Sequence, residues 1–409
     1  MVKIKPFEVE QWMDAYETTA KYNIAETCSA SISISELKEI SDDKNTEPID
    51  FSTILSYGEI RGSTALRSNL ARLYSVKTNA PLPADNILVT PGAIMANTLL
   101  FYALVGPGDH VICHYPTYQQ LYDVPASLGA EVTLWKANEE KGWALDIEEL
   151  KAMIKPNTKL IILNNPNNPT GALIPKTQLE SIIEIAKQHN NIPILSDEVY
   201  RPVFHSITPL DPEFPPSLLS MGYPNALTTG SLSKAYSLAG IRIGWIASRS
   251  QTLISKIAAA RDYTTISVSQ LDDQVATFAL SQNTIHPLLA RNIQLARTNV
   301  QILEKFIAQH SWACEWTKPK AGTVAFVKFS KMGDPVDDVE FCRRLHEETG
   351  VMFCPGSKCF GDGKEFQGYV RMGFACKTEV LEEGLEKLKL WLKGSYKEIP
   401  LAASSSASQ

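Results

Sequence analysis

The middle of the chain alternates short, nearly continuous apolar runs with segments whose apolar residues recur at helical spacing. Helices are predicted between the runs, for example over 93–104, 118–128 and 178–189. Such runs, separated by helices, are typical of a parallel sheet that is covered on both faces. We therefore expect an α/β protein whose large domain holds a seven-stranded, mostly parallel sheet between helices. The seven predicted strands are 86–90, 109–113, 131–135, 159–163, 192–195, 226–229 and 243–247.

The pattern changes after about residue 300. Residues 323–329 alternate as in a half-buried strand, 369–374 form another strand-like run, and 339–349 and 379–393 have the spacing of amphipathic helices. This pattern predicts a smaller α+β domain with open-faced strands. The first forty or so residues lack a strong strand run and are expected to pack on that domain, which makes it discontinuous. The expected parts are an N-terminal segment 1–45, a large domain 46–295, a small domain 296–395 and a disordered Ser/Ala-rich tail 396–409.

Composition narrows the possible functions. A chain of 409 residues is too long for one ordinary core, and its net charge of −6 without a basic block favours neither nucleic acid nor an anionic membrane. The longest apolar runs, such as 160–163, are too short to span a bilayer, and residues 1–6 do not resemble an apolar signal segment. The seven cysteines are scattered and odd in number, which argues against a disulfide framework, and Cys354 and Cys359 lack a second pair for zinc. We expect a reducing, cytoplasmic setting and no metal.

The most informative stretch is Ser231-Leu232-Ser233-Lys234, which Arg242 follows eight residues after the lysine. A lysine amine can form a Schiff base with an aldehyde. Two hydroxyls and a guanidinium nearby can hold a dianion. An aldehyde and a phosphate on one small molecule describe pyridoxal phosphate (PLP). Taken alone, the same run would also fit a solvated loop.

The chemistry of this cofactor sets further requirements. Its pyridine ring withdraws electrons while the ring nitrogen stays protonated, which needs a buried carboxylate. Asp197 ends a predicted strand and suits that nitrogen, and Tyr200 follows it near the phenolic oxygen; alternatively, Asp197 caps a helix. Asn168 lies in a rigid loop after another strand and could donate to the same oxygen, although turn chemistry alone explains such a loop.

The phosphate needs backbone amides at a helix N-terminus, and the ring needs a stacking partner. Gly92-Ala93-Ile94 follows a strand and begins a helix, so its amides are candidates, unless it is a plain turn. Tyr118 follows the next strand and could lie on the ring, although an aromatic residue there is more often part of the core. All these candidates lie at the carboxyl ends of predicted strands, where open α/β sheets bind ligands.

The ordered motifs resemble those of the class I/II aminotransferases of the aspartate aminotransferase superfamily, which have fold type I. The resemblance runs from about Tyr57 to Lys393. It rests on eight motifs in the order typical of the family. They are Gly92-Ala93, Tyr115-Pro116-Thr117-Tyr118, Asn167-Asn168-Pro169-Thr170-Gly171, Asp197-Glu198-Val199-Tyr200, Ser231-Leu232-Ser233-Lys234, Gly240-Ile241-Arg242-Ile243-Gly244, Pro355-Gly356-Ser357-Lys358-Cys359-Phe360-Gly361 and Tyr369-Val370-Arg371-Met372-Gly373-Phe374.

The resemblance implies a role for each matching residue. Lys234 would be the Schiff-base lysine, and Arg371 would bind the substrate α-carboxylate as a bidentate pair. Tyr57 resembles the family tyrosine that reaches the phosphate of the neighbouring subunit, which implies a homodimer with shared active sites. The remaining roles are Asp197 at the ring nitrogen, Asn168 and Tyr200 at the phenolic oxygen, Tyr118 on the ring, and Ser231, Ser233, Arg242 and the amides of Gly92, Ala93 and Ile94 at the phosphate.

The resemblance is weaker near the N-terminus. The family's usual Gly-x-Pro-x-Phe stretch beside the substrate is absent, and Tyr22-Asn23-Ile24-Ala25-Glu26-Thr27-Cys28-Ser29-Ala30 stands in its place. This segment is similar to that of the capreomycidine synthase branch, whose reaction closes a ring. By this resemblance Glu26 would face a cationic group of the substrate; alternatively, it is a solvated or capping carboxylate.

Three functions remain open from the sequence. The first is transamination of an amino acid, with Lys234 taking the α-proton. The second is elimination or cyclisation on the same scaffold, because the catalytic set does not distinguish these outcomes. The third is a ligand sensor fused to a DNA-binding domain, which the acidic balance and the absence of a basic recognition helix disfavour.

Overall fold

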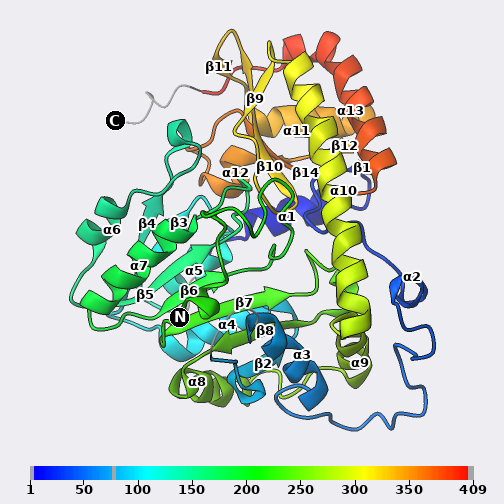
Figure 1. Cartoon of the computed structure of the whole chain (residues 1–409). Coiled ribbons are helices and arrows are strands. Elements are labelled where there is room, and N and C mark those ends of the chain that lie inside the picture. Colours follow the sequence, from blue (N-terminus) through cyan, green and yellow to red (C-terminus); the bar gives the residue numbers. More distant parts are fainter. Residues whose placement is uncertain (1–3, 76–79, 404–409) are drawn as a thin grey trace.

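The computed structural model describes residues 4–75 and 80–403, and it confirms the predicted seven-stranded sheet (Figure 1). The strand order is β2-β8-β7-β6-β5-β3-β4, and every pairing is parallel except those of β8 with β2 and β7. The strands are β2 (Ile87–Thr90), β3 (His110–Tyr115), β4 (Glu131–Lys136), β5 (Thr158–Asn164), β6 (Ile194–Asp197), β7 (Ala226–Ser231) and β8 (Gly244–Ser248).

Side chains from both faces of the sheet are buried, as the continuous apolar runs require. In β5, Leu160 and Ile162 join a core cluster on one face, while Ile161 joins the cluster on the other face. The first cluster includes side chains of α4 (Gly92–Leu104), α5 (Gln120–Ser127) and α8 (Gln251–Arg261). The second includes side chains of α3 (Thr64–Ser75), α6 (Ile147–Met153), α7 (Lys176–Gln188) and α9 (Gln270–Ala279).

A second, smaller sheet lies toward the C-terminus and is antiparallel, in the order β11-β10-β14-β13, with β9 beside β10. The expected open faces are wrong, because both sides of this sheet are covered. On β10, Phe329 packs against Phe341 with ring centroids 4.5 Å apart, and Phe326 packs near Trp143 at 5.8 Å. The elements are β9 (Cys314–Trp316), β10 (Val324–Lys331), β11 (Asp334–Pro335), β12 (Val351–Met352), β13 (Cys354–Pro355), β14 (Tyr369–Gly373), α11 (Asp338–Thr349), α12 (Gly356–Phe360) and α13 (Thr378–Lys393).

The N-terminal residues lie against this C-terminal unit. Strand β1 (Tyr22–Asn23) pairs in parallel with β12, and the indole nitrogen of Trp12 in α1 (Glu8–Tyr16) donates to the Phe353 carbonyl over 2.8 Å. Helix α2 (Ile34–Ile40) follows, with Ser33 and Glu36 forming a capping box at its start. Two segments far apart in sequence therefore form one unit beside the large sheet.

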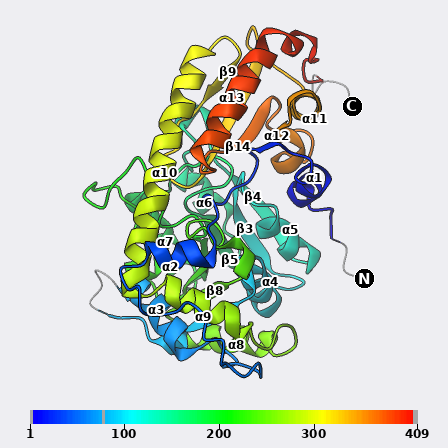
Figure 2. The same ribbon diagram turned by 90° about the vertical axis from the view of Figure 1, so that its right-hand side faces the viewer.

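The domain boundary expected at 295/296 lies inside a single helix, α10 (Gln282–Gln309). Figure 2 shows α10 running from the level of the large sheet to the C-terminal unit. A continuous amphipathic helix contains neither a turn nor a shift in composition. The sequence pattern therefore does not mark where one domain ends and the next begins.

The expected disorder from residue 396 is wrong for the residues described there. A 3-10 helix spans Ser395–Glu398, Tyr396 and Ile399 are buried, and Leu401 forms a β-bridge with Val336. Burial of these two apolar side chains offsets the entropy of ordering the segment. The rest of the expected tail, 404–409, lies outside the described residues.

Candidate active site

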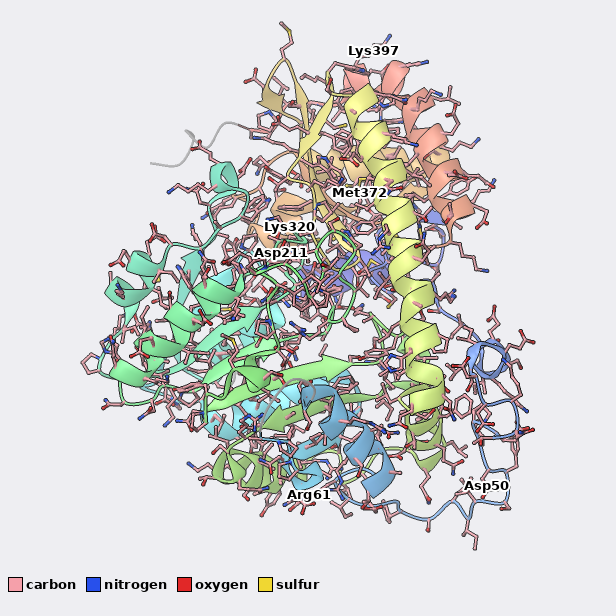
Figure 3. The ribbon with its side chains drawn as sticks, viewed as in Figure 1. Asp50, Arg61, Asp211, Lys320, Met372 and Lys397 are labelled. Atoms are coloured by element: carbon pink, nitrogen blue, oxygen red, sulfur yellow. The ribbon has the colours of Figure 1, made fainter. Side chains whose placement is uncertain are left out.

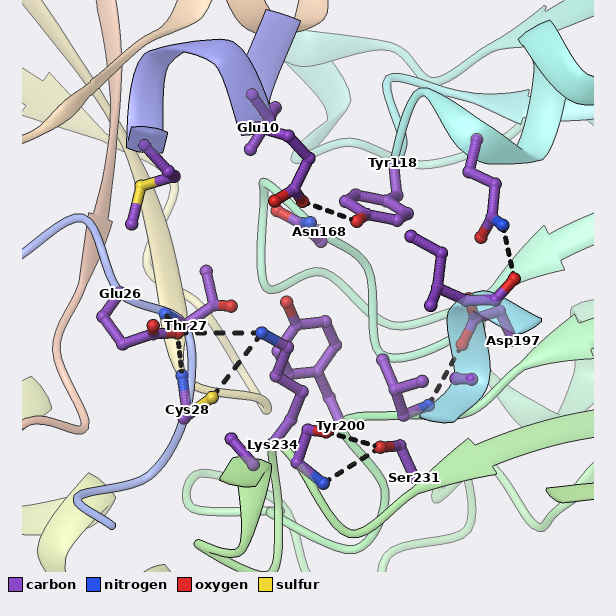
Figure 4. Close-up of a pocket in the computed structure, with 18 of the residues that line it drawn as sticks. Glu10, Glu26, Thr27, Cys28, Tyr118, Asn168, Asp197, Tyr200, Ser231 and Lys234 are labelled. Carbon is purple, nitrogen blue, oxygen red and sulfur yellow. Dashed lines mark hydrogen bonds and ion pairs between the residues drawn. The ribbon is translucent and has the colours of Figure 1, made fainter. Parts of the chain in front are cut away.

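A cavity of about 630 Å³ lies where the carboxyl ends of the large sheet's parallel strands face the N-terminal segment and the C-terminal unit. Figure 4 shows the side chains that point into it. The predicted residues that line this cavity are Glu26, Ala93, Ile94, Tyr118, Asn168, Asp197, Tyr200, Ser231, Ser233, Lys234, Arg242 and Arg371.

The start of α4 is shaped as an anion cradle. This helix has no side-chain cap, so its first backbone amides keep free hydrogens. Gly92 has φ +79°, and a Cβ built on it would lie 2.7 Å from Nη2 of Arg242. A Cβ on Gly244 would lie 2.4 Å from the backbone nitrogen of Ala93. Two glycines thus bring backbone amides and a guanidinium together, as a phosphate requires.

Hydroxyls complete the cradle on the side of β7. Oγ of Ser231 donates to Oγ of Ser233 over 2.8 Å, and Nη1 of Arg242 lies 3.4 Å from the Ser233 oxygen. Arg242 itself adopts the left-handed region, with φ +51°, and its Nη1 also donates to the Ala239 carbonyl. The two serines and the arginine that the sequence singled out therefore converge.

Asp197 lies at the end of β6, is 3% exposed, and has no cation among its hydrogen-bond partners. Burial raises the pKa of Asp197 to about 6, against the opposing effect of hydrogen bonds that Asn97 and the Val199 amide donate to it. A buried carboxylate in this state is stabilised when a cation is placed beside it. A protonated ring nitrogen would supply that charge.

Lys234 follows β7 and points at two residues of the N-terminal segment (Figure 4). Its Nζ lies 3.7 Å from Oε1 of Glu26 and 3.6 Å from Sγ of Cys28. Burial disfavours the Lys234 ammonium, but the neighbouring Cys28 thiol and the carboxylate of Glu26 together outweigh burial, so the pKa of Lys234 is raised. Glu26 responds in the opposite sense: burial opposes its ionisation, yet Lys234 and hydrogen bonds from Cys28 and Thr27 lower its pKa to about 2.

Arg371 is 3% exposed and lies on β14, opposite the large sheet. Its Nη2 donates to the Ala25 carbonyl over 3.0 Å, and its Nη1 lies 3.4 Å from Oδ1 of Asn168. The Nε–H has no partner among the described residues. A buried guanidinium with a free N–H in a cavity can bind a carboxylate.

Two tyrosines, Tyr118 and Tyr200, also line the cavity. Tyr200 is 2% exposed; burial raises its pKa, and the charges of Lys234 and Arg371 oppose the rise. The hydroxyl of Tyr118 donates to Oε1 of Glu10 over 2.7 Å, and its ring lies 4.8 Å from that of Phe7. The structure therefore gives Tyr118 polar and aromatic neighbours on α1 and its N-cap, which the sequence did not suggest.

Tyr57 does not line the cavity of its own chain. It is 78% exposed and lies on the loop between α2 and α3, together with exposed Phe51, Ile54 and Leu55. Figure 3 shows Asp50 of this loop at the edge of the molecule. A single chain therefore leaves Tyr57 without a role in its own site.

The sequence reasoning missed several cavity residues, among them Asn97, Cys28 and Glu10. Asn97 donates to Oδ2 of Asp197. The sequence feature that could have identified it is a buried-helix position occupied by a polar residue in a mostly apolar helix. Cys28 belongs to the segment that replaces the usual family stretch, but nothing in its type indicated contact with Lys234. Glu10 lies on α1, which has no motif.

Two other kinds of site are not found. No group of three or more His, Cys, Asp or Glu side chains that could hold a metal exists within residues 4–75 and 80–403. Over the same ranges, no helix has the length and apolar character needed to cross a membrane.

Pyridoxal phosphate fits the anion cradle, the buried carboxylate of Asp197 and the amine of Lys234. Comparisons with known proteins point to the same cofactor. The family model for aminotransferase class I and II matches residues 35–388. Capreomycidine synthase from Streptomyces vinaceus is 30% identical over 305 residues, 75% of this chain and 74% of that protein. Aspartate aminotransferase from Thermotoga maritima is 28% identical over 341 residues, 83% of this chain and 84% of the relative.

Solved structures give the same answer. A PLP-dependent aminotransferase from Streptococcus suis 89-1591 has a TM-score of 0.85 and 41% identity, with 96% of this chain and 98% of that one covered. The PLP-dependent cyclase OrfR has a TM-score of 0.82 at 23% identity, covering 96% and 98%, and shows the shared fold. Fold and site together define a PLP-dependent enzyme that acts on an amino acid. The chain belongs to the class I and II aminotransferases.

Proposed function

We propose that the protein transfers the amino group of an amino acid, with Lys234 as the residue that binds the cofactor aldehyde covalently. The observation that carries this proposal is that Lys234, Asp197 and Arg371, from three separate segments, line one cavity. When bound, pyridoxal phosphate supplies an electron sink for the bonds at the substrate Cα. The cradle of Gly92, Ala93, Ile94, Ser231, Ser233 and Arg242 would hold its phosphate.

The other residues act on the ring and the substrate. Asp197 would keep the ring nitrogen protonated, with Asn97 orienting the carboxylate. Asn168 and Tyr200 would bind the phenolic oxygen, and Tyr118 would lie on the ring. Arg371 would bind the substrate α-carboxylate through its free N–H and so orient the Cα–H bond. Nζ of Lys234, once released from the cofactor, would remove the Cα proton.

We further propose a homodimer in which Tyr57 reaches the phosphate site of the partner subunit. The supporting observation is the exposed apolar stretch on the loop that carries it, since such patches are typical of interaction surfaces. A cytoplasmic location is proposed because all seven cysteines are free, as in a reducing compartment. Size measurement in solution and imaging of a tagged chain test these two proposals.

Cyclisation or elimination is the second candidate function. It is favoured by the segment Glu26-Thr27-Cys28 beside Lys234, which replaces the usual family stretch, and by the similarity to capreomycidine synthase and OrfR. Both candidate reactions begin with proton removal at Cα. They differ in whether the amino group stays on the cofactor or on the product.

A single experiment separates the two candidates. The purified holoenzyme is mixed with a panel of amino acids and no keto acid, while the cofactor absorbance is followed. Transamination converts the cofactor to its amine form once per site and then stops. Cyclisation or elimination consumes substrate repeatedly and leaves the absorbance as it was at the start. If no amino acid is consumed and the absorbance never changes, both candidates are contradicted.

A further inference from the structure

One wall of the cavity is formed by helix α1, which has no role in the chemistry of the cofactor. Glu10 and Asp14 of α1 and Glu17 at its C-cap all line the cavity. Their spacing of four and three residues puts them on one face of the helix. We propose that this acidic face binds a cationic group at the end of the substrate side chain, such as a guanidinium or an amine. The inference rests on the proposed function and adds the substrate class to it.

The opposite face of α1 is fixed to the C-terminal unit. Trp12 is buried there, and its indole donates to the Phe353 carbonyl. Glu8 pairs with Lys358 over 2.8 Å, which places the one remaining carboxylate of the helix away from the cavity. The acidic face is therefore directed at the cavity by packing.

Arg371 gives an independent indication of a ligand in the same cavity. Its Nε–H is buried and has no partner among the described residues. A carboxylate is the ligand group that such an N–H requires. With the α-carboxylate bound there and the α-amino group directed to the cofactor at Lys234, only the substrate side chain remains to occupy the space beside α1.

The charges in the cavity decide which side chain fits. The lining has three cations, Lys234, Arg242 and Arg371, and each has a role with the cofactor or the α-carboxylate. It also has five carboxylates, of which only Asp197 has such a role. Within the described part of the chain, no ion pair involves Glu10, Asp14 or Glu17. Among the described residues, the one cation that pairs with Glu26 is Lys234, and this pair would be altered when the lysine binds the aldehyde.

This excess of negative charge favours a cationic side chain and disfavours an acidic one. Glu10 has a further constraint, because the Tyr118 hydroxyl donates to it and holds its carboxylate in one position (Figure 4). A positioned carboxylate discriminates a cation from a neutral group of the same shape.

L-Arginine and L-citrulline form the sharpest probe, because they share size and shape and differ in charge. We expect the holoenzyme to show a kcat/KM for L-arginine at least about tenfold above that for L-citrulline. The preference should shrink as sodium chloride is raised, since the carboxylates are solvent-exposed. Calorimetric binding to the Lys234→Ala variant, which cannot take the Cα proton, gives the same comparison without turnover.

The double variant Glu10→Gln/Asp14→Asn removes two charges and keeps the side-chain shapes. It should bring the arginine-to-citrulline ratio of kcat/KM close to one. Glu8→Gln is the matched control, because it removes one carboxylate from the same helix outside the cavity, and it should keep the ratio. Tyr118→Phe tests whether holding Glu10 matters and should lower the ratio partially.

The outcomes separate this inference from the function on which it rests. If neutral, aromatic or acidic amino acids react and arginine-like ones do not, the charge inference is wrong and the enzyme assignment stands. A preference for arginine that survives the double variant also overturns it. If no amino acid reacts at all, both the function and the inference fail.

Discussion

Two sides of the cavity are built in different ways. The cofactor side consists of segments at the ends of sheet strands, where Asp197, Ser231 and Ser233 are buried and fixed by hydrogen bonds. The substrate side includes residues 9–28, which pack on the C-terminal unit and precede the stretch that matches the family, 35–388. The cofactor side thus lies within the stretch that the family model matches, whereas residues 9–28 of the substrate side lie outside it.

The largest expected effect is on the cofactor side. Lys234→Ala should lower turnover by at least about 10⁴-fold, because both covalent attachment and proton removal are lost. The circular dichroism spectrum should match that of wild type, since the side chain contributes to the cavity and not to the core. Normal turnover by a folded Lys234→Ala protein would contradict the assignment of this lysine and, with it, the contrast between the two sides.

Asp197→Asn should lower turnover by about 10²- to 10⁴-fold, because a neutral amide cannot hold a proton on the ring nitrogen. The same change should stabilise the cofactor-free protein. The folded pKa of Asp197 is raised to about 6, so its ionisation destabilises the folded chain as pH rises from about 4 to above 6.

The stability effect has a defined pH dependence. At pH 7 the cofactor-free Asp197→Asn protein should unfold with a free energy roughly 1–3 kcal/mol above that of wild type, and the difference should diminish toward pH 4. Urea denaturation at both pH values measures it. Asp338, whose pKa burial also raises to about 6, is present in both proteins and cancels from the comparison. A variant less stable than wild type at pH 7 would show that Asp197 has another partner.

The third prediction concerns the phosphate cradle. In Gly244→Ala the added methyl would meet the Ala93 nitrogen and displace the start of α4, so the Kd for pyridoxal phosphate should rise about 10- to 100-fold. Gly240→Ala is the matched control from the same motif, because a Cβ there meets nothing within 4 Å. Equilibrium dialysis of the cofactor measures both. Equal affinities in the two variants would contradict the close approach of Arg242, Gly244 and the α4 amides.

The cofactor side was also the more predictable side. Strand periodicity gave all seven strands of the large sheet, and chemistry at their carboxyl ends pointed to Lys234, Asp197 and Arg242. This worked because parallel strands place their carboxyl ends at one edge, so position in sequence implies position in space. The open faces expected for the smaller sheet were wrong, because Phe326 packs near Trp143 of a distant segment and Phe329 packs on Phe341 of the next helix.

The substrate side could not be predicted in the same way. Glu10 and Cys28 belong to segments whose position depends on packing against β12 and Phe353, more than three hundred residues later. No local pattern encodes such a contact. Glu26 was singled out only because the Gly-x-Pro-x-Phe stretch usual in the family is absent, and its pairing with Lys234 is seen only in the structure.

The smallest expected effect concerns the ion pair between Glu26 on the substrate side and Lys234 on the cofactor side. Glu26→Gln removes the carboxylate that stabilises the Lys234 ammonium, so the pKa of Lys234 should fall. Only the neutral amine attacks an aldehyde, and the cofactor-free variant should therefore capture pyridoxal phosphate about three- to tenfold faster near pH 8, with its rate profile moved to lower pH. Stopped-flow absorbance measures the rate. Cys28→Ala is the control, because burial raises the pKa of the Cys28 thiol to about 11 and its loss removes no charge at that pH. If both variants bind pyridoxal phosphate at the wild-type rate, the residues of the large sheet alone determine the pKa of Lys234. The N-terminal segment would then act only on the substrate.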